Sequence, residues 1–133
     1  MQSKEPIYKK PYENVDSVDE SVWFSNDTPV IETDFTYVFD DKYPCVEGHR
    51  LFIPKENNGH FVGKSYGLAY DYGDEKVKAG EIDGYNIGMN IGVCAGQTIM
   101  WPHIHFIPRH KGDADYVGGM RHALPNADHK HYY

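Results

Sequence analysis

Two histidines, His103 and His105, stand two residues apart within the run 99–107. Successive side chains of a β-strand point to opposite faces, so the two imidazoles would project from the same face. Apolar residues at the even positions of this run favour a strand, with Trp101 on the face of the two histidines. Imidazoles paired on one face can act as nucleophile and proton donor near neutral pH, or they can ligate a metal. The pattern therefore predicts a chemical site on this strand.

The sequence around the two histidines belongs to two ordered blocks. Residues 95–109 read AGQTIMWPHIHFIPR, and residues 39–55 read FDDKYPCVEGHRLFIPK. Together the blocks resemble the histidine triad (HIT) family, whose signature alternates three histidines with apolar residues, and here Trp101 replaces the first of the three. The resemblance covers roughly residues 35–119. It implies an α+β fold with a mainly antiparallel sheet of about five strands, a shortened helical element on one face and the catalytic strand near an edge.

The resemblance also implies catalytic roles. His103 would attack the α-phosphorus of a nucleotide and become transiently nucleotidylated, and neutral imidazole is a competent nucleophile near pH 7. His105 would donate to a phosphate oxygen as negative charge builds there. His49 would support the proton network, although a packing histidine at a strand start fits it nearly as well. Thr98 would reach the phosphate or the leaving oxygen, with turn hydrogen bonding as the alternative.

Five further residues are expected to contact the substrate. Asp41 would accept from the ribose hydroxyls, because a carboxylate offers two acceptor oxygens and no donor. Phe39 would flank the base, although a core phenylalanine is an equally good interpretation. Asn90 and Gln97 would contact phosphate, with turn hydrogen bonding as the alternative for Gln97. Trp101 has no acceptor to relay protons, so it would wall off water or lie against the nucleotide, which favours binding over turnover.

A metal centre is the main alternative use of the two histidines. A cupin metal motif begins in the same way and then needs a glutamate a few residues later, but residues 108–112 hold no carboxylate. A zinc or iron site made by His49, His103 and His105 stays open, because three imidazoles form a common ligand set. We expect neither a metal nor another cofactor.

Composition narrows the class of protein. A chain of 133 residues fits one domain, and its formal net charge of -7 disfavours binding to nucleic-acid backbones, which requires a basic face. There is no apolar run near the roughly 18 residues that a membrane span needs. Cys45 and Cys94 lack a metal-like spacing, and the sequence shows no secretory leader. These features together predict a cytoplasmic protein.

The chain is expected to divide into three parts. Residues 1–20 are predicted to be a polar N-terminal extension, residues 21–125 a HIT-like catalytic domain, and residues 126–133 a tail rich in histidine and tyrosine. Residues 64–81 are the best helix candidate, but the glycines between positions 59 and 80 predict a broken, shortened helix. Alternation and β-branched residues predict strands at residues 35–39, 49–53, 84–91 and 99–107.

These observations lead to one functional hypothesis and two alternatives. The first is hydrolysis at the α-phosphorus of a dinucleoside polyphosphate or a nucleoside phosphoramidate, with an adenine or guanine base and a nucleotidyl-His103 intermediate. The resemblance implies a homodimer, and Ile-Pro-Arg followed by Gly-Asp leans toward the polyphosphate branch. A nucleotidyl transferase shares the first step. A nucleotide-binding module with weak or no turnover is favoured by Trp101. Arg109 is left outside the predicted site.

Overall fold

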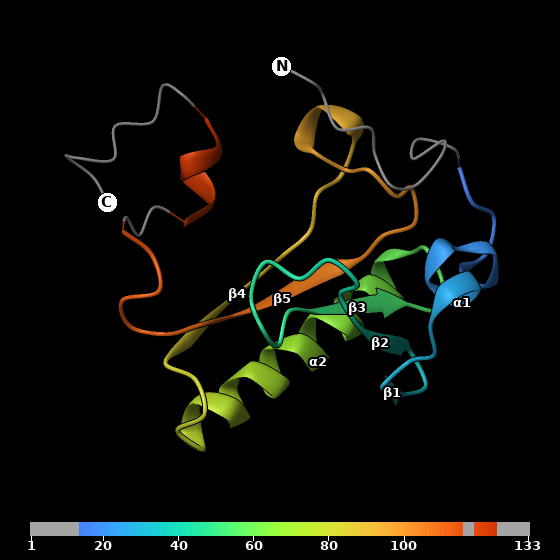
Figure 1. Ribbon diagram of the computed structural model, residues 1–133. Helices are drawn as coiled ribbons and strands as arrows, with labels where there is room; N and C mark the ends of the chain where they lie inside the picture. Colours follow the sequence, from blue (N-terminus) through green and yellow to red (C-terminus); the bar gives the residue numbers. More distant parts are fainter. Residues whose placement is uncertain (1–13, 116–118, 125–133) are drawn as a thin grey trace.

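One antiparallel sheet organises the structure, a computed structural model that describes residues 14–115 and 119–124 (Figure 1). Its strand order is β1-β2-β3-β5-β4, so the predicted sheet of about five strands is confirmed and β5 lies beside the edge strand β4. The strands are β1 (Ile31–Glu32), β2 (Thr36–Asp40), β3 (Arg50–Pro54), β4 (Gly84–Gly88) and β5 (Ile104–Arg109). The helices are η1 (Val18–Glu20), α1 (Val22–Asn26), α2 (Gly59–Lys78), η2 (Val93–Ala95) and η3 (Gly119–Ala123).

The sheet separates two hydrophobic clusters. Helix α2 crosses one face, as Figure 1 shows, and buries the cluster Val38, Phe52, Ala69, Ile82, Ile104 and Phe106. The other face carries the cluster Val18, Trp23, Phe39, Leu51, Ile53 and Trp101. Burial alternates along β5, so Ile104 and Phe106 face α2 whereas His105 faces away from it. The sheet face predicted to carry the catalytic histidines is therefore the face opposite α2.

Helix α2 is continuous over 20 residues, so the expectation that glycines break it is wrong. Its first turn is capped by Asn58, whose Oδ1 accepts from the Phe61 N–H at 2.9 Å. A Cβ at Gly67 would meet open space, so glycine there lowers the stability of the helix only through its poor helix propensity. Gly73 has a packing role, because a Cβ there would lie 2.6 Å from ring atoms of Tyr85. Tertiary packing thus overrides the weak local preference of these glycines.

Two strand boundaries also differ from the prediction. β5 begins at Ile104 rather than at residue 99, and β4 ends at Gly88 rather than at residue 91. The connection between them holds η2, where Gly92 (φ 93°) and Gly96 (φ 97°) adopt backbone angles that favour glycine. His103 is therefore positioned by the end of a loop and not by a strand ladder.

The N-terminal extension contributes more than expected. Val18 is 7 % exposed and packs in the same cluster as Trp23, so the end of the predicted extension is part of the core. Residues 1–13 and the predicted tail at 126–133 lie outside the described residues. No helix in the described ranges is both long enough and apolar enough to cross a membrane.

Candidate active site

A cleft of about 580 Å³ runs along β4 and β5 on the sheet face opposite α2. We call it the histidine cleft. Gly88 pairs with His105 across the two strands, and its missing side chain leaves room beside the imidazole. The lining residues are His49, Asn86, Ile87, Gly88, Met89, Asn90, His105, Ile107, Arg109, Gly119 and Met120.

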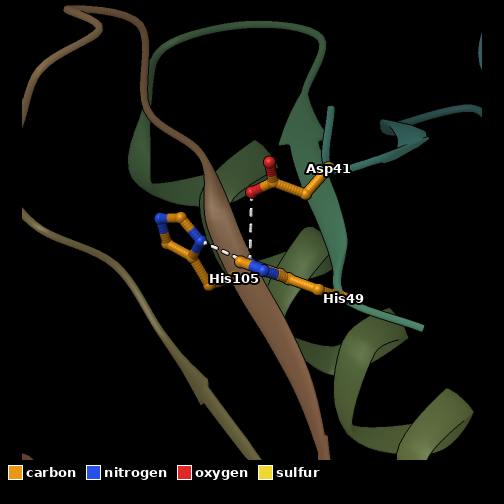
Figure 2. Close-up of side chains that lie close together, drawn as sticks. All are labelled: Asp41, His49 and His105. Atoms are coloured by element: carbon orange, nitrogen blue, oxygen red, sulfur yellow. Dashed lines mark hydrogen bonds and ion pairs between the residues drawn. The ribbon is translucent and has the colours of Figure 1, made fainter. Parts of the chain in front are cut away.

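Three side chains from two distant segments meet (Figure 2), and two of them, His49 and His105, line this cleft. His49 Nε2 lies 3.0 Å from His105 Nδ1 and 3.2 Å from Asp41 Oδ2. The loop between β2 and β3 supplies Asp41 and His49, and β5 supplies His105. Pairing of β3 with β5, in which Leu51 lies opposite His105, brings the two sequence blocks together.

Hydrogen bonds determine which ring nitrogen carries the proton in His49 and in His105. The Cys45 backbone N–H donates to His49 Nδ1 at 3.2 Å, so neutral His49 carries its proton on Nε2. That proton is shared between Asp41 Oδ2 and His105 Nδ1, which makes His105 Nδ1 an acceptor. The proton of His105 is then on Nε2, the nitrogen that points away from His49 in Figure 2. His105 can donate from there to a substrate oxygen.

Burial keeps all three histidines neutral near pH 7. Desolvation, reinforced by His103 and His49, lowers the pKa of His105 to about 4. Desolvation also lowers the pKa of His49, outweighing the opposite effect of Asp41. The pKa of His103 is lowered by burial as well, against the hydrogen bond to the Trp101 carbonyl. At pH 7 the His49–Asp41 contact is therefore a hydrogen bond from neutral imidazole rather than an ion pair.

His103 is held next to this pair in a single orientation. Its Nδ1 donates to the Trp101 carbonyl oxygen at 2.8 Å, which leaves the lone pair on Nε2. Its ring centroid lies 5.2 Å from that of His105 and 5.0 Å from that of Trp23. The side chain is only 6 % exposed, and it lies beside the histidine cleft without lining it. A neutral imidazole with an unprotonated Nε2 thus neighbours a neutral imidazole that can donate from its Nε2–H.

The same group was tested as a metal site. Asp41, His49 and His105 each offer one ligand atom, and the three atoms lie within 4.8 Å of one another. A metal on His49 Nε2 would require the ring proton on Nδ1, where ligating histidines donate to an acceptor. At that position the Cys45 amide already donates, so two N–H groups would oppose each other. The donor set fits a hydrogen-bonded network better than a metal centre.

Two residues expected at the substrate are core residues. Phe39 is fully buried with Trp23 and Leu51, so it does not flank an open base site. Trp101 is 4 % exposed in the same cluster, and its Nε1–H donates to the Pro54 carbonyl oxygen at 2.9 Å. In this structure the ring fills the core and does not line the histidine cleft, and its expected role of walling off water or lying against the nucleotide stays a prediction.

Asp41 and Gln97 are likewise used by the protein itself. Asp41 Oδ1 accepts from the Tyr43 N–H at 2.8 Å, in addition to the contact of Oδ2 with His49. Gln97 closes the loop before β5, because its Oε1 accepts from the Gly92 N–H and its Nε2 donates to the Ile99 carbonyl. The alternative of turn hydrogen bonding thus describes the position of Gln97.

Of the remaining predicted residues, Asn90 lies in the cleft and Thr98 lies on the exposed loop. Sequence reasoning missed Arg109 and Asn86, which line the cleft and contact each other through Nη1 and Oδ1 at 2.8 Å. The signal was available in part, since strand alternation places Arg109 on the face of His105. Asn86 could not be recognised without the β4–β5 register.

The chain was compared with known protein families, proteins and structures. The HIT domain profile matches residues 25–112, which include every histidine of the site. The chain belongs to the HIT family. Adenosine 5'-monophosphoramidase of Saccharomyces cerevisiae is 35 % identical over 83 residues, covering 60 % of this HIT protein and 52 % of the yeast protein. An adenylylsulfatase of Arabidopsis thaliana is 34 % identical over 89 residues, covering 62 % and 45 % of the two chains. The match thus spans about half the length of these relatives.

Solved structures show the same fold. A zinc-bound histidine triad protein from Mycobacterium smegmatis superposes with a TM-score of 0.59 at 27 % identity, covering 64 % of this HIT protein and 67 % of that chain. A histidine triad nucleotide-binding protein from Sulfolobus tokodaii superposes with a TM-score of 0.56 at 30 % identity, covering 64 % and 62 %. The HIT-like α+β fold expected from the two sequence blocks is therefore confirmed.

Proposed function

We propose that this HIT protein hydrolyses a nucleotide at its α-phosphorus through a covalent bond between phosphorus and His103 Nε2. The observation that carries the proposal is the 2.8 Å hydrogen bond from His103 Nδ1 to the Trp101 carbonyl, which leaves Nε2 unprotonated. Membership of the HIT family and the relatives named adenosine 5'-monophosphoramidase and adenylylsulfatase support nucleotide hydrolysis in general.

The chemistry would proceed in two displacements. In the first, His103 Nε2 bonds to phosphorus while the bond to the leaving group breaks. The leaving group departs with the bonding electron pair: a phosphate leaves as an anion, and the nitrogen of a phosphoramidate takes up a proton from water so that a neutral amine leaves. The ring becomes cationic, and the Trp101 carbonyl stabilises it through the proton on Nδ1. In the second, water attacks phosphorus and the P–N bond breaks. This releases a nucleoside monophosphate, neutral His103 and one proton.

The other two histidines would act without changing charge. His105 Nε2–H would donate to a non-bridging phosphate oxygen, a role that requires the proton to be on Nε2 and not on Nδ1. His49 would maintain that tautomer through its contact with His105 Nδ1, and Asp41 would orient His49. A contact of Asp41 with the ribose, an adenine or guanine base, a homodimeric assembly and a cytoplasmic setting remain predictions from the resemblance and the composition.

The test is the His103→Ala variant, with His60→Ala as a matched control. His60 lies exposed on α2, outside the histidine cleft. We expect His103→Ala to reduce kcat by several orders of magnitude with nucleotide affinity within about tenfold, since a nucleophile acts mainly in the transition state. Mass spectrometry of the acid-sensitive adduct should find one nucleotidyl group on the wild type. A near-normal rate for His103→Ala would refute the mechanism.

One observation favours a second candidate, a nucleotide-binding module with weak or no turnover. His103 is 6 % exposed and packs against Trp23, so the nucleophile is less open than the histidine cleft beside it. Calorimetry with adenosine monophosphate alongside a hydrolysis assay separates the two. Binding without turnover on a phosphoramidate, a dinucleoside polyphosphate and a transfer acceptor would select the binding module.

A further inference from the structure

We propose that Arg109 forms a subsite for a phosphate-bearing leaving group in the histidine cleft. This inference rests on the proposed function and extends it to a substrate class. It predicts that the enzyme prefers nucleotides whose leaving group is anionic, such as dinucleoside polyphosphates, over phosphoramidates that release a neutral amine.

The strand register places Arg109 in line with His105. Both residues lie on the face of β5 that points away from α2, with Ile107 between them. On β4, Gly88 pairs with His105, and Asn86 pairs with Ile107. Arg109 Nη1 donates to Asn86 Oδ1 at 2.8 Å, so the guanidinium extends back along the cleft toward His105. It ends near the level of Ile107, two residues or about 7 Å of strand from His105.

The guanidinium is held before any ligand binds. Its Nε and Nη2 donate to the two oxygens of Asp113 at 2.9 and 2.8 Å. Asp113 is itself fixed by the His110 N–H at 2.8 Å, and Arg109 holds the pKa of this carboxyl well below its usual range. Three of the five N–H groups of Arg109 are thus engaged, which leaves one N–H on each terminal nitrogen. A fixed pair of donors suits two oxygens of a phosphate.

The lining of the cleft fits an anion. Arg109 is the one permanently charged side chain among the described residues of the histidine cleft, and no carboxylate lines it. This is notable in a chain whose formal net charge is -7. The Arg109 side chain is 30 % exposed, so it can reach a ligand without a change of rotamer. Asp113 neutralises its charge in part, so recognition would depend on directed hydrogen bonds more than on long-range attraction.

The experiment compares diadenosine tetraphosphate with adenosine phosphoramidate, whose leaving group is ammonia. We expect Arg109→Gln to raise KM for the tetraphosphate about tenfold or more, and to change kcat/KM for the phosphoramidate less than threefold. Lys111→Gln is the matched control, because it removes one exposed cation two residues away. Asp113→Asn should raise KM for the tetraphosphate by an intermediate factor, since the guanidinium remains but is less firmly held.

Other outcomes are equally decisive. Equal losses on both substrates, or no loss on either, would overturn the subsite. If the wild type hydrolyses neither substrate, the proposed function fails, and calorimetry with adenosine mono- and triphosphate then tests the subsite alone. A loss of affinity in Arg109→Gln confined to the triphosphate would uphold it. Equal losses of affinity for the monophosphate and the triphosphate, or a wild type that binds neither nucleotide, would overturn the Arg109 subsite.

Discussion

His49 and His105, 56 positions apart in the chain, are joined by a 3.0 Å contact between Nε2 of one ring and Nδ1 of the other. The Cys45 amide determines which nitrogen of His49 carries the proton, and that choice in turn determines the tautomer of His105. The backbone N–H of Cys45 thereby determines which ring nitrogen of His105 carries a proton that can be donated.

The first prediction tests this tautomer relay. His49→Leu should lower kcat at least tenfold, about 1.4 kcal/mol of transition-state stabilisation, because His105 loses the donor that keeps its proton on Nε2. His49→Gln should recover part of the rate, since its amide N–H can replace Nε2–H. The pKa of His105 should rise in His49→Leu, as measured by NMR titration of the ring. Equal rates for the Leu and Gln variants would mean that His49 is a packing residue.

The second prediction concerns pH. Because folding lowers the pKa of His105 to about 4 from an unfolded value near 6.5, the unfolded chain binds more protons in that range. The contribution of His105 to the free energy of unfolding should therefore be fully present above about pH 7 and fall progressively from about pH 6.5 to pH 4. Urea midpoints at pH 7.5, 5.5 and 4.5 measure this. The variant His105→Gln should show a smaller loss, and an identical pH dependence would contradict the assignment.

The third prediction follows from the burial of Trp101. Trp101→His should destabilise the fold by about 2–4 kcal/mol, because a smaller, polar ring leaves a cavity and the Pro54 carbonyl loses its donor. Placing at position 101 the histidine that the resemblance implies should therefore not raise kcat. Thermal unfolding beside steady-state kinetics checks both. Trp101→Phe separates the causes, since it keeps the aromatic packing and removes the hydrogen bond; a stable and faster Trp101→His would refute the core assignment.

The fourth prediction contrasts two glycines of α2. Gly67→Ala should stabilise the protein by about 0.5–1 kcal/mol, because the added methyl meets open space and helix propensity improves. Gly73→Ala should destabilise it by about 1–3 kcal/mol, since the methyl would collide with the Tyr85 ring that stacks on Phe106. Denaturant midpoints of the two variants should thus move in opposite directions. A Gly73→Ala variant that is stabilised would show that propensity outweighs packing at this position, and a destabilised Gly67→Ala would contradict the open space assigned to that methyl.

Local sequence patterns were sufficient to predict part of this molecule. The resemblance carried by residues 95–109 and 39–55 was enough to predict the family, the antiparallel sheet and a site on one sheet face. These features depend on residue type and short spacing, which are properties of the chain itself. The two-residue period of a strand also places Arg109, four positions after His105, on the same face.

Only the tertiary structure decided how these residues are used. Helix α2 packs on the sheet, and the Tyr85 ring occupies the space that a side chain at Gly73 would need, a contact between distant segments that helix propensity does not record. The placement of Trp101 in the core depends on a hydrogen bond to Pro54, 47 positions away. The tautomer of His105 depends on Cys45 and His49 in another loop. Such contacts arise from strand register and burial, which act through space, so spacing along the chain carries no record of them.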